Sequence, residues 1–143
     1  MRRPMFKKIL IANDGSEGAA RALSAAIRLA KLCDAELHMI SVEELPAFPA
    51  SVDEVIEEKD EANHIYEAVT RRAIAQANAE GRKLTAHVVV GHPVPAITEF
   101  VEREGFDLLV VGYMGHSALY NRLIGSTTDR LVEHAPSEVL VIK

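Results

Sequence analysis

Apolar residues occur along this chain as short unbroken runs that alternate with longer stretches of helical spacing. The short runs predict strands buried on both faces of a sheet, and they span Phe6–Ala12, Glu36–Val42, Leu84–Val90, Leu108–Val111 and Val139–Ile142. Between them, apolar residues three and four positions apart predict helices that cover 17–33, 52–80 and 127–134, and a short helix after Gly91-His92-Pro93. The chain therefore alternates strand and helix four times and closes on a strand.

Regular alternation of this kind predicts a parallel α/β sheet with right-handed crossovers and helices on both faces. At 143 residues the chain has the size of one domain, with no internal repeat or domain boundary, so we expect a single domain over 1–143. Ligands of such sheets bind at the carboxyl ends of the strands. Residues 43–51, with two prolines and no periodicity, predict a loop that leaves such an end and could fold over a ligand.

Composition and charge narrow the classes of function. The net charge of −5 argues against a phosphate-backbone partner, so no nucleic-acid binding is expected. The single Cys33 excludes an internal disulfide, and a redox role is not expected for it. No apolar run is long enough to span a bilayer, so no membrane is expected. The basic start of the chain is followed by an apolar run that breaks at Asn13-Asp14, which predicts a cytoplasmic protein rather than an exported one.

The six histidines are scattered along the sequence. None forms a pair at the spacing of metal ligands, so we expect surface or loop histidines and no metal site. They are His38, His64, His87, His92, His116 and His134.

Glycines follow the fourth apolar run at once. Gly112 and Gly115 lack a Cβ, so they suit a tight loop that lets a bulky group approach the backbone. Gly125 then opens the last helix, where Ser126 with Asp129 three positions later predicts a capping box. Free amides and a helix dipole at such a start favour an anion, most often phosphate.

Two well-known phosphate loops are absent from the sequence. A Walker A loop needs G-x4-G-K-[ST], which the chain lacks. A Rossmann fingerprint would place G-x-G-x-x-G after the first strand, where Asn13-Asp14-Gly15-Ser16 stands instead. The phosphate signal therefore belongs to neither class.

The pattern Gly112-x2-Gly115-x9-Gly125-Ser126 resembles, in its spacing, the nucleotide motif of the ATP-binding branch of the universal stress protein family. The likeness extends from the first strand with its Asp-Gly-Ser turn to the Ala-Pro before the last strand. It implies a single-domain, Rossmann-like (adenine nucleotide alpha hydrolase-like) fold, with a five-stranded parallel sheet in the order 3-2-1-4-5.

The resemblance also implies a site for ATP. It assigns to the nucleotide Ala12, Asn13, Asp14, Val42, Val111, Gly112, Gly115, His116, Arg122, Gly125, Ser126 and Thr127. Val42 would read adenine through main-chain groups, and the first two glycines would pass the ribose and α-phosphate. Gly125 and the two hydroxyl residues after it would hold the β- and γ-phosphates. Asp14 would contact the ribose or, through water, a Mg²⁺ ion held mainly by the phosphates.

The chain departs from the family between the first two glycines, where Tyr113 and Met114 replace small polar and basic residues. His116 and Arg122 are expected to restore positive charge, and unchanged nucleotide affinity in Arg122→Ala would remove that residue from the site. Structural alternatives remain open: the glycines could only shape a turn, Ser126 could only cap a helix, and Asp14 could only stabilise its turn.

Three functions follow from these residues. The first is an ATP-binding regulatory protein of the stress response that acts on an unknown protein partner, as a homodimer through the last strand. The second is a weak enzyme that hydrolyses ATP slowly or phosphorylates itself on Ser126, Thr127 or Thr128, with Asp14 or His116 as base. The third is an interaction module without nucleotide.

Overall fold

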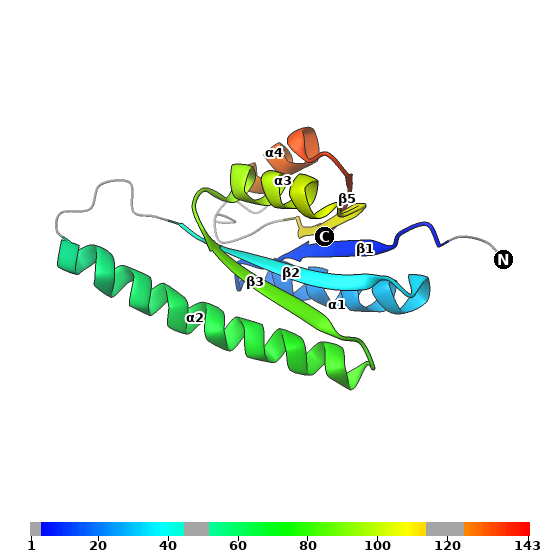
Figure 1. Cartoon of the computed structure of the whole chain (residues 1–143), viewed down its shortest axis with the longest axis horizontal. Coiled ribbons are helices and arrows are strands. Elements are labelled where there is room, and N and C mark those ends of the chain that lie inside the picture. Colours follow the sequence, from blue (N-terminus) through cyan, green and yellow to red (C-terminus); the bar gives the residue numbers. More distant parts are fainter. Residues whose placement is uncertain (1–3, 45–51, 114–124) are drawn as a thin grey trace.

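A computed structural model describes residues 4–44, 52–113 and 125–143, with the side chains of 52–65 left aside. Its helices and strands, in chain order, are β1 (Lys8–Ala12), α1 (Glu17–Cys33), β2 (Glu36–Glu43), α2 (Val52–Ala79), β3 (Leu84–Val90), α3 (Pro93–Glu104), β4 (Leu108–Gly112), α4 (Ser126–His134) and β5 (Glu138–Ile142). The strands form one parallel sheet in the order β3-β2-β1-β4-β5, which confirms the expected topology (Figure 1).

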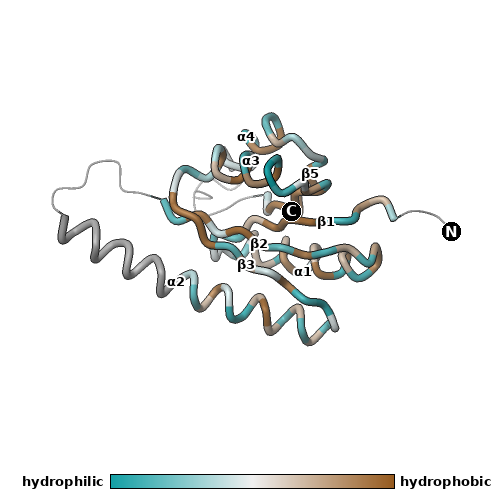
Figure 2. Tube along the Cα trace, in the orientation of Figure 1, coloured by the Kyte–Doolittle hydropathy of each residue, from teal (hydrophilic) through white to brown (hydrophobic). Residues whose placement is uncertain are grey.

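Helices cover both faces of this sheet. In Figure 1, α1 and α2 lie below the strands, and α3 and α4 lie above them. Successive residues of a strand point to opposite faces, so Ile9 and Ile11 pack in the cluster with α1 and α2, whereas Leu10 packs in the cluster with α3 and α4. All three side chains are fully buried. The apolar colour concentrated along the central strands in Figure 2 marks this double core.

The helices and strands begin and end close to the predicted residues, with shifts of one or two positions. Ser16 is the N-cap of α1, as predicted, because its Oγ accepts a hydrogen bond from the Ala19 amide at 3.2 Å. β1 begins at Lys8 rather than at Phe6, and β5 begins at Glu138, one residue early. Most of the predicted 43–51 loop lies outside the described residues. No helix in the described part of the chain is long and apolar enough to cross a membrane.

Candidate functional site

A cavity of about 360 Å³ opens at the carboxyl ends of β1, β2 and β4, beside the first turn of α4. The predicted site residues that line it are Ala12, Asn13, Asp14, Val42, Val111, Gly112, Gly125, Ser126 and Thr127. The structure thus brings together segments that lie far apart in the sequence. Gly115, His116 and Arg122, which were also predicted, fall outside the described residues.

One wall of the cavity is the turn after β1, and its polar groups are bonded within the protein. Asn13 Oδ1 accepts from the Gly15 amide at 2.9 Å, and Asp14 Oδ1 accepts from the Ser16 amide at 3.0 Å. Gly15 has φ +83°, a conformation that glycine adopts without strain. The buried Asn13 also donates through Nδ2 to the sulfur of Met39. Asn13 therefore shapes the wall, and Asp14 stabilises the turn while bordering the cavity.

The opposite wall is the start of α4, where the predicted capping box is wrong. The N-cap is Gly125, with φ −58° and ψ 144°, and Ser126 is already the first helical residue. A capping residue needs non-helical backbone, so Ser126 inside the first turn does not cap the helix with its hydroxyl. Among the described residues, no hydrogen-bond acceptor meets the backbone amides of Ser126 and Thr127.

Two hydrogen bonds fix where α4 begins. Thr128 Oγ1 donates to the Gly112 carbonyl at 2.7 Å, and the Gly125 amide donates to the Tyr113 carbonyl at 2.9 Å. Both bonds join the helix start to the end of β4. The first amides of α4 are therefore held at the rim of the cavity by a neighbouring strand.

Gly112 is required because the backbone of α1 passes close to it. A Cβ at this position would lie 2.7 Å from the backbone carbon and 2.8 Å from the carbonyl oxygen of Gly18 in α1. The missing side chain therefore lets α1 pack against the end of β4. The group that comes close to the Gly112 backbone in the described structure is helix α1. Gly112 also borders the cavity.

Tyr66 of α2 lines the cavity and was missed by sequence reasoning. Its hydroxyl donates to the Val42 carbonyl at 3.1 Å, at the strand end predicted to read adenine. Burial raises the pKa of Tyr66, and the carboxylates of Asp14, Glu44 and Glu43 raise it further. The hydroxyl therefore stays protonated and keeps its donor. No sequence motif marks Tyr66, because only the path of α2 brings it to β2.

The cavity is consequently polarised. Carboxylates of Asp14 and Glu44 border the end near Tyr66, whereas unbonded amides and two hydroxyls border the end at α4. Between the two ends, apolar side chains form the lining, contributed by Ile40, Val42, Ile97, Val111 and Leu131. Such a space suits a flat apolar group with polar edges near Tyr66 and an anion at α4.

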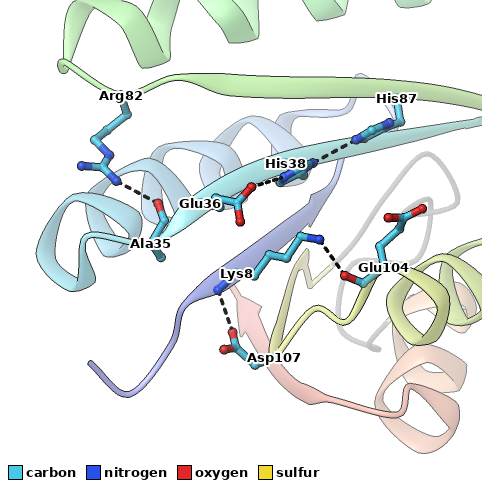
Figure 3. A network of polar contacts seen from close by, with 8 residues as sticks. All are labelled: Lys8, Ala35, Glu36, His38, Arg82, His87, Glu104 and Asp107. Carbon is cyan, nitrogen blue, oxygen red and sulfur yellow. Dashed lines mark hydrogen bonds and ion pairs between the residues drawn. The ribbon is translucent and has the colours of Figure 1, made fainter. Parts of the chain in front are cut away.

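The expectation that all histidines lie on the surface or in loops is wrong for His38 and His87. These residues lie on β2 and β3, and their ring nitrogens Nδ1 and Nε2 are 3.0 Å apart (Figure 3). They are 49 positions apart in the sequence, so sequence spacing carried no signal of the pair. In the described part of the chain, no three His, Cys, Asp or Glu side chains are arranged to hold a metal ion.

Sequence comparison gives a family for this arrangement. The model of the universal stress protein family matches residues 5–143. Universal stress protein MJ0531 of Methanocaldococcus jannaschii is 34% identical to the chain, over 97% of this chain and 83% of that protein.

Two solved structures are similar over nearly the whole chain. Universal stress protein UspA from Lactobacillus plantarum superposes with a TM-score of 0.87 at 27% identity, and the match covers all of both chains. A universal stress protein crystallised in complex with cAMP superposes with a TM-score of 0.76 at 28% identity, over 96% of this chain and 97% of the other.

Proposed function

The chain belongs to the universal stress protein family, and from this premise we propose that it is a regulatory protein whose cavity binds ATP. The observation that carries the proposal is the polarised cavity, in which one end offers unbonded amides and the other offers hydrogen-bond acceptors. A related structure, 28% identical, holds cAMP, which is also an adenine nucleotide. Nucleotide occupancy would then alter the surface that a protein partner contacts.

We place the phosphates at the start of α4. The amides of Ser126 and Thr127 point toward the N-terminal side of the helix, where the helix dipole favours negative charge. The hydroxyls of both residues also border the cavity and can donate to phosphate oxygens. The carboxylates of Asp14 and Glu44 repel phosphate from the opposite end, so they fix the direction of the ligand.

We place the base near Val42 and Tyr66. The apolar lining between the two ends gives a flat ring a surface to contact. The Val42 carbonyl already accepts from Tyr66, and a carbonyl oxygen has a second lone pair for an amino group of the base. The ribose would then lie near Asp14.

Mg²⁺ fits the oxygen groups that border this cavity. The ion prefers oxygen ligands and keeps several waters, and it is held chiefly by the phosphates of a nucleotide. Asp14 and Glu44 supply carboxylates to the cavity, and Asp14 would contact the ion through water. Bound in this way, the ion would neutralise part of the negative charge of the phosphates.

We also propose that two copies pair through β5. This strand forms one edge of the sheet, so one side of its backbone has no neighbouring strand within the described chain. Leu140 on this edge strand is 37% exposed. Covering an apolar edge by a second copy removes the risk of unwanted strand pairing.

Two measurements on the purified protein test the proposal. Mass spectrometry of the small molecules released on denaturation should detect an adenine nucleotide. Mg-ATP added at about a hundred times its dissociation constant should stabilise the protein by roughly 2.7 kcal/mol in thermal unfolding. Absence of both signals would favour an interaction module without nucleotide.

The hydroxyls of Ser126 and Thr127 lie where we place the phosphates, which favours self-phosphorylation as a second activity. A single-turnover assay with labelled ATP separates this activity from simple binding. Phosphate release or labelled protein that disappears in Asp14→Asn would establish a weak enzyme with Asp14 as base. Intact ATP and unlabelled protein would leave binding as the function.

A further inference from the structure

Away from the cavity, a chain of three polar side chains joins β2 to β3 on the face covered by α3. His38 Nε2 lies 3.3 Å from Glu36 Oε1, and His38 Nδ1 lies 3.0 Å from His87 Nε2 (Figure 3). His87 is opposite Ile40 in the sheet register, so it reaches diagonally across the strands to His38. The three side chains therefore form a continuous line of hydrogen bonds.

The two imidazole rings lie end to end in one plane. Their planes differ by 4°, and their centroids are 5.3 Å apart. With two ring nitrogens only 3.0 Å apart, a centroid separation that large requires both nitrogens to lie on the line between the centroids. A lone pair on one nitrogen then points directly at the proton on the other, which is ideal hydrogen-bond geometry.

This geometry fixes the tautomers of the neutral pair. A carboxylate only accepts, so His38 Nε2 carries the proton that faces Glu36, and His38 Nδ1 has the lone pair. His87 Nε2 then carries the proton of the bond between the two rings. When both rings are protonated, each of these facing nitrogens carries a hydrogen, and the bond is replaced by repulsion between two cations.

The surroundings act mostly against a second proton. Burial lowers the pKa of His87, and His38 and Lys8 lower it further, while Glu104 of α3 opposes them. Lys8 Nζ of β1 donates to the Glu104 carbonyl and sits 4.8 Å from the centre of the Phe106 ring, which contacts His38.

Two further charged groups face the pair. Arg103 of α3 lines the hollow of about 470 Å³ beside the two rings and adds positive charge. Glu36 has an exposed carboxylate, 68% accessible, so water weakens its charge and its main effect is to orient His38. The hydrogen bond between His38 and His87 is therefore kept while one proton lies between the two rings. The surrounding charges disfavour a second proton at this position.

A metal ion is a poorer occupant of this position than a proton. A bridging metal needs about 2.0–2.1 Å to each nitrogen at an angle, whereas here the two nitrogens face each other along one line. Among the described residues, no third His, Cys, Asp or Glu completes a ligand set.

The position of the pair gives its protonation a structural consequence. β3 is an edge strand, so all of its sheet partners lie on β2, from Leu37 opposite Leu84 to Glu43 opposite Val90. The residues of β2 opposite His87 and Val89 are Ile40 and Val42, and both line the cavity. The neighbouring hollow offers space into which the His87 ring can turn when its bond is lost.

We propose that Glu36, His38 and His87 form an acid-sensitive latch that fastens edge strand β3 to β2. The latch is closed while one proton lies between the two rings, and it opens when both rings become cations. Opening breaks the side-chain link between β3 and β2 on the face covered by α3. The β2 residues Ile40 and Val42, which line the cavity, are then held less firmly. The latch needs no nucleotide, so its test is independent of the proposed ATP site.

Hydrogen exchange of the β3 amides in the ligand-free protein tests the latch. In the opened strand, His87 binds a proton when the pH is below its ordinary pKa of about 6.5. In the closed latch, His87 does not bind this proton. Opening is therefore coupled to the uptake of one proton. As pH falls below that value, the opening constant of residues 84–90 should therefore rise, approaching about tenfold per pH unit. Corrections for intrinsic exchange rates apply to every sample.

His87→Gln is the decisive variant, because glutamine keeps an N–H donor for His38 but does not titrate. We expect its β3 opening constant to be nearly independent of pH over this range. His134→Gln, at a histidine on the exposed surface of α4, is the matched control and should behave as the wild type. A wild-type slope equal to that of His87→Gln would overturn the proposal.

Histidine NMR on the wild-type protein gives a second test that does not depend on any variant folding. The ring signals of His87 should titrate below the ordinary histidine pKa of about 6.5, because burial and the neighbouring His38 lower the pKa of His87. The β3 amide signals should shift with the same midpoint as His87. Titration of His87 at or above about pH 6.5, with no matching shift of the β3 amides, would contradict the latch.

Discussion

Helices α1 and α4 begin at the same cavity, yet only α1 has a side chain that caps its first turn. At α1, Ser16 Oγ bonds the Ala19 amide, and Asn13 and Asp14 bond the two amides just before the helix. At α4, the N-cap is Gly125, which has no side chain to offer. The protein's own side chain therefore caps α1 at its third amide, whereas no side chain of the described residues caps the start of α4 beside the cavity.

The difference bears on where we propose that the phosphates bind. Both ends carry the same dipole, but an anion gains most where the amides have no partner already. A serine followed by polar residues marks both places in the sequence. The serine caps the helix only if the helix begins at the residue after it. This is the case for Ser16 in α1, whereas α4 already begins at Ser126.

The largest effect is expected at Gly112, which holds the two helix starts in their relative positions. Gly112→Ala would place a Cβ 2.7 Å from the backbone of Gly18, and backbone atoms cannot turn aside as a side chain can. We expect a loss of about 3 kcal/mol in the free energy of unfolding, measured by urea denaturation. Gly125→Ala is the matched control, because the φ and ψ angles of Gly125 suit any residue. Equal losses in both variants would refute the steric explanation.

Removing the N-cap of α1 is expected to have the next largest effect on stability. Ser16→Ala removes the oxygen that accepts from the Ala19 amide, and loss of such a cap costs about 1 kcal/mol. Urea denaturation of the ligand-free protein measures this loss. Ser126→Ala at the start of α4 is the comparison, and it should change stability much less because Ser126 caps nothing. A loss at Ser126 as large as that at Ser16 would show that the two starts are alike.

Adding a side-chain N-cap to α4 should have a smaller effect, which increases stability. Gly125→Asp places an acceptor and a negative charge at the N-cap, so the ligand-free protein should gain about 0.5 kcal/mol. Thermal unfolding without nucleotide measures the gain. Gly125→Asn, which can cap without a charge, separates the hydrogen bond from the dipole. A loss of stability in both variants would mean that the amides already have partners.

The smallest effect concerns the acidic end of the cavity and appears only at high pH. The pKa of Tyr66 is raised in the folded protein, so the unfolded chain loses this proton first. The contribution of Tyr66 to stability is therefore complete below about pH 10 and is lost as pH rises through the folded pKa. Tyr66→Phe should lose less stability than the wild type as the pH rises above about 10 in urea denaturation. Parallel curves would contradict the raised pKa.

Much of the fold was predictable because its signals are local. Buried runs such as Ile9-Leu10-Ile11 mark strands covered on both faces, and Ser16 marks a helix start. The cavity could be anticipated as well, since parallel strands end at one edge and carry their following residues there. These features need only the order of residues along the chain.

The remaining features depend on contacts between distant segments. Tyr66 reaches Val42 through the course of a long helix, and His38 meets His87 through the register of two strands. The start of α4 is set by the bond from Thr128 to Gly112 rather than by the Ser-x-x-Asp pattern. Gly112 is needed by α1, a partner that the glycine spacing does not reveal.

Calorimetric binding of ATP and of adenosine to the wild type and to Gly125→Asp tests most directly whether α4 holds the phosphates. The added carboxylate would compete for the open amides and repel phosphate, so ATP should lose at least about tenfold in affinity, or roughly 1.4 kcal/mol. Adenosine, which has no phosphate, should keep nearly its wild-type affinity. Equal changes for the two ligands, or unchanged ATP affinity, would contradict a phosphate site at the start of α4.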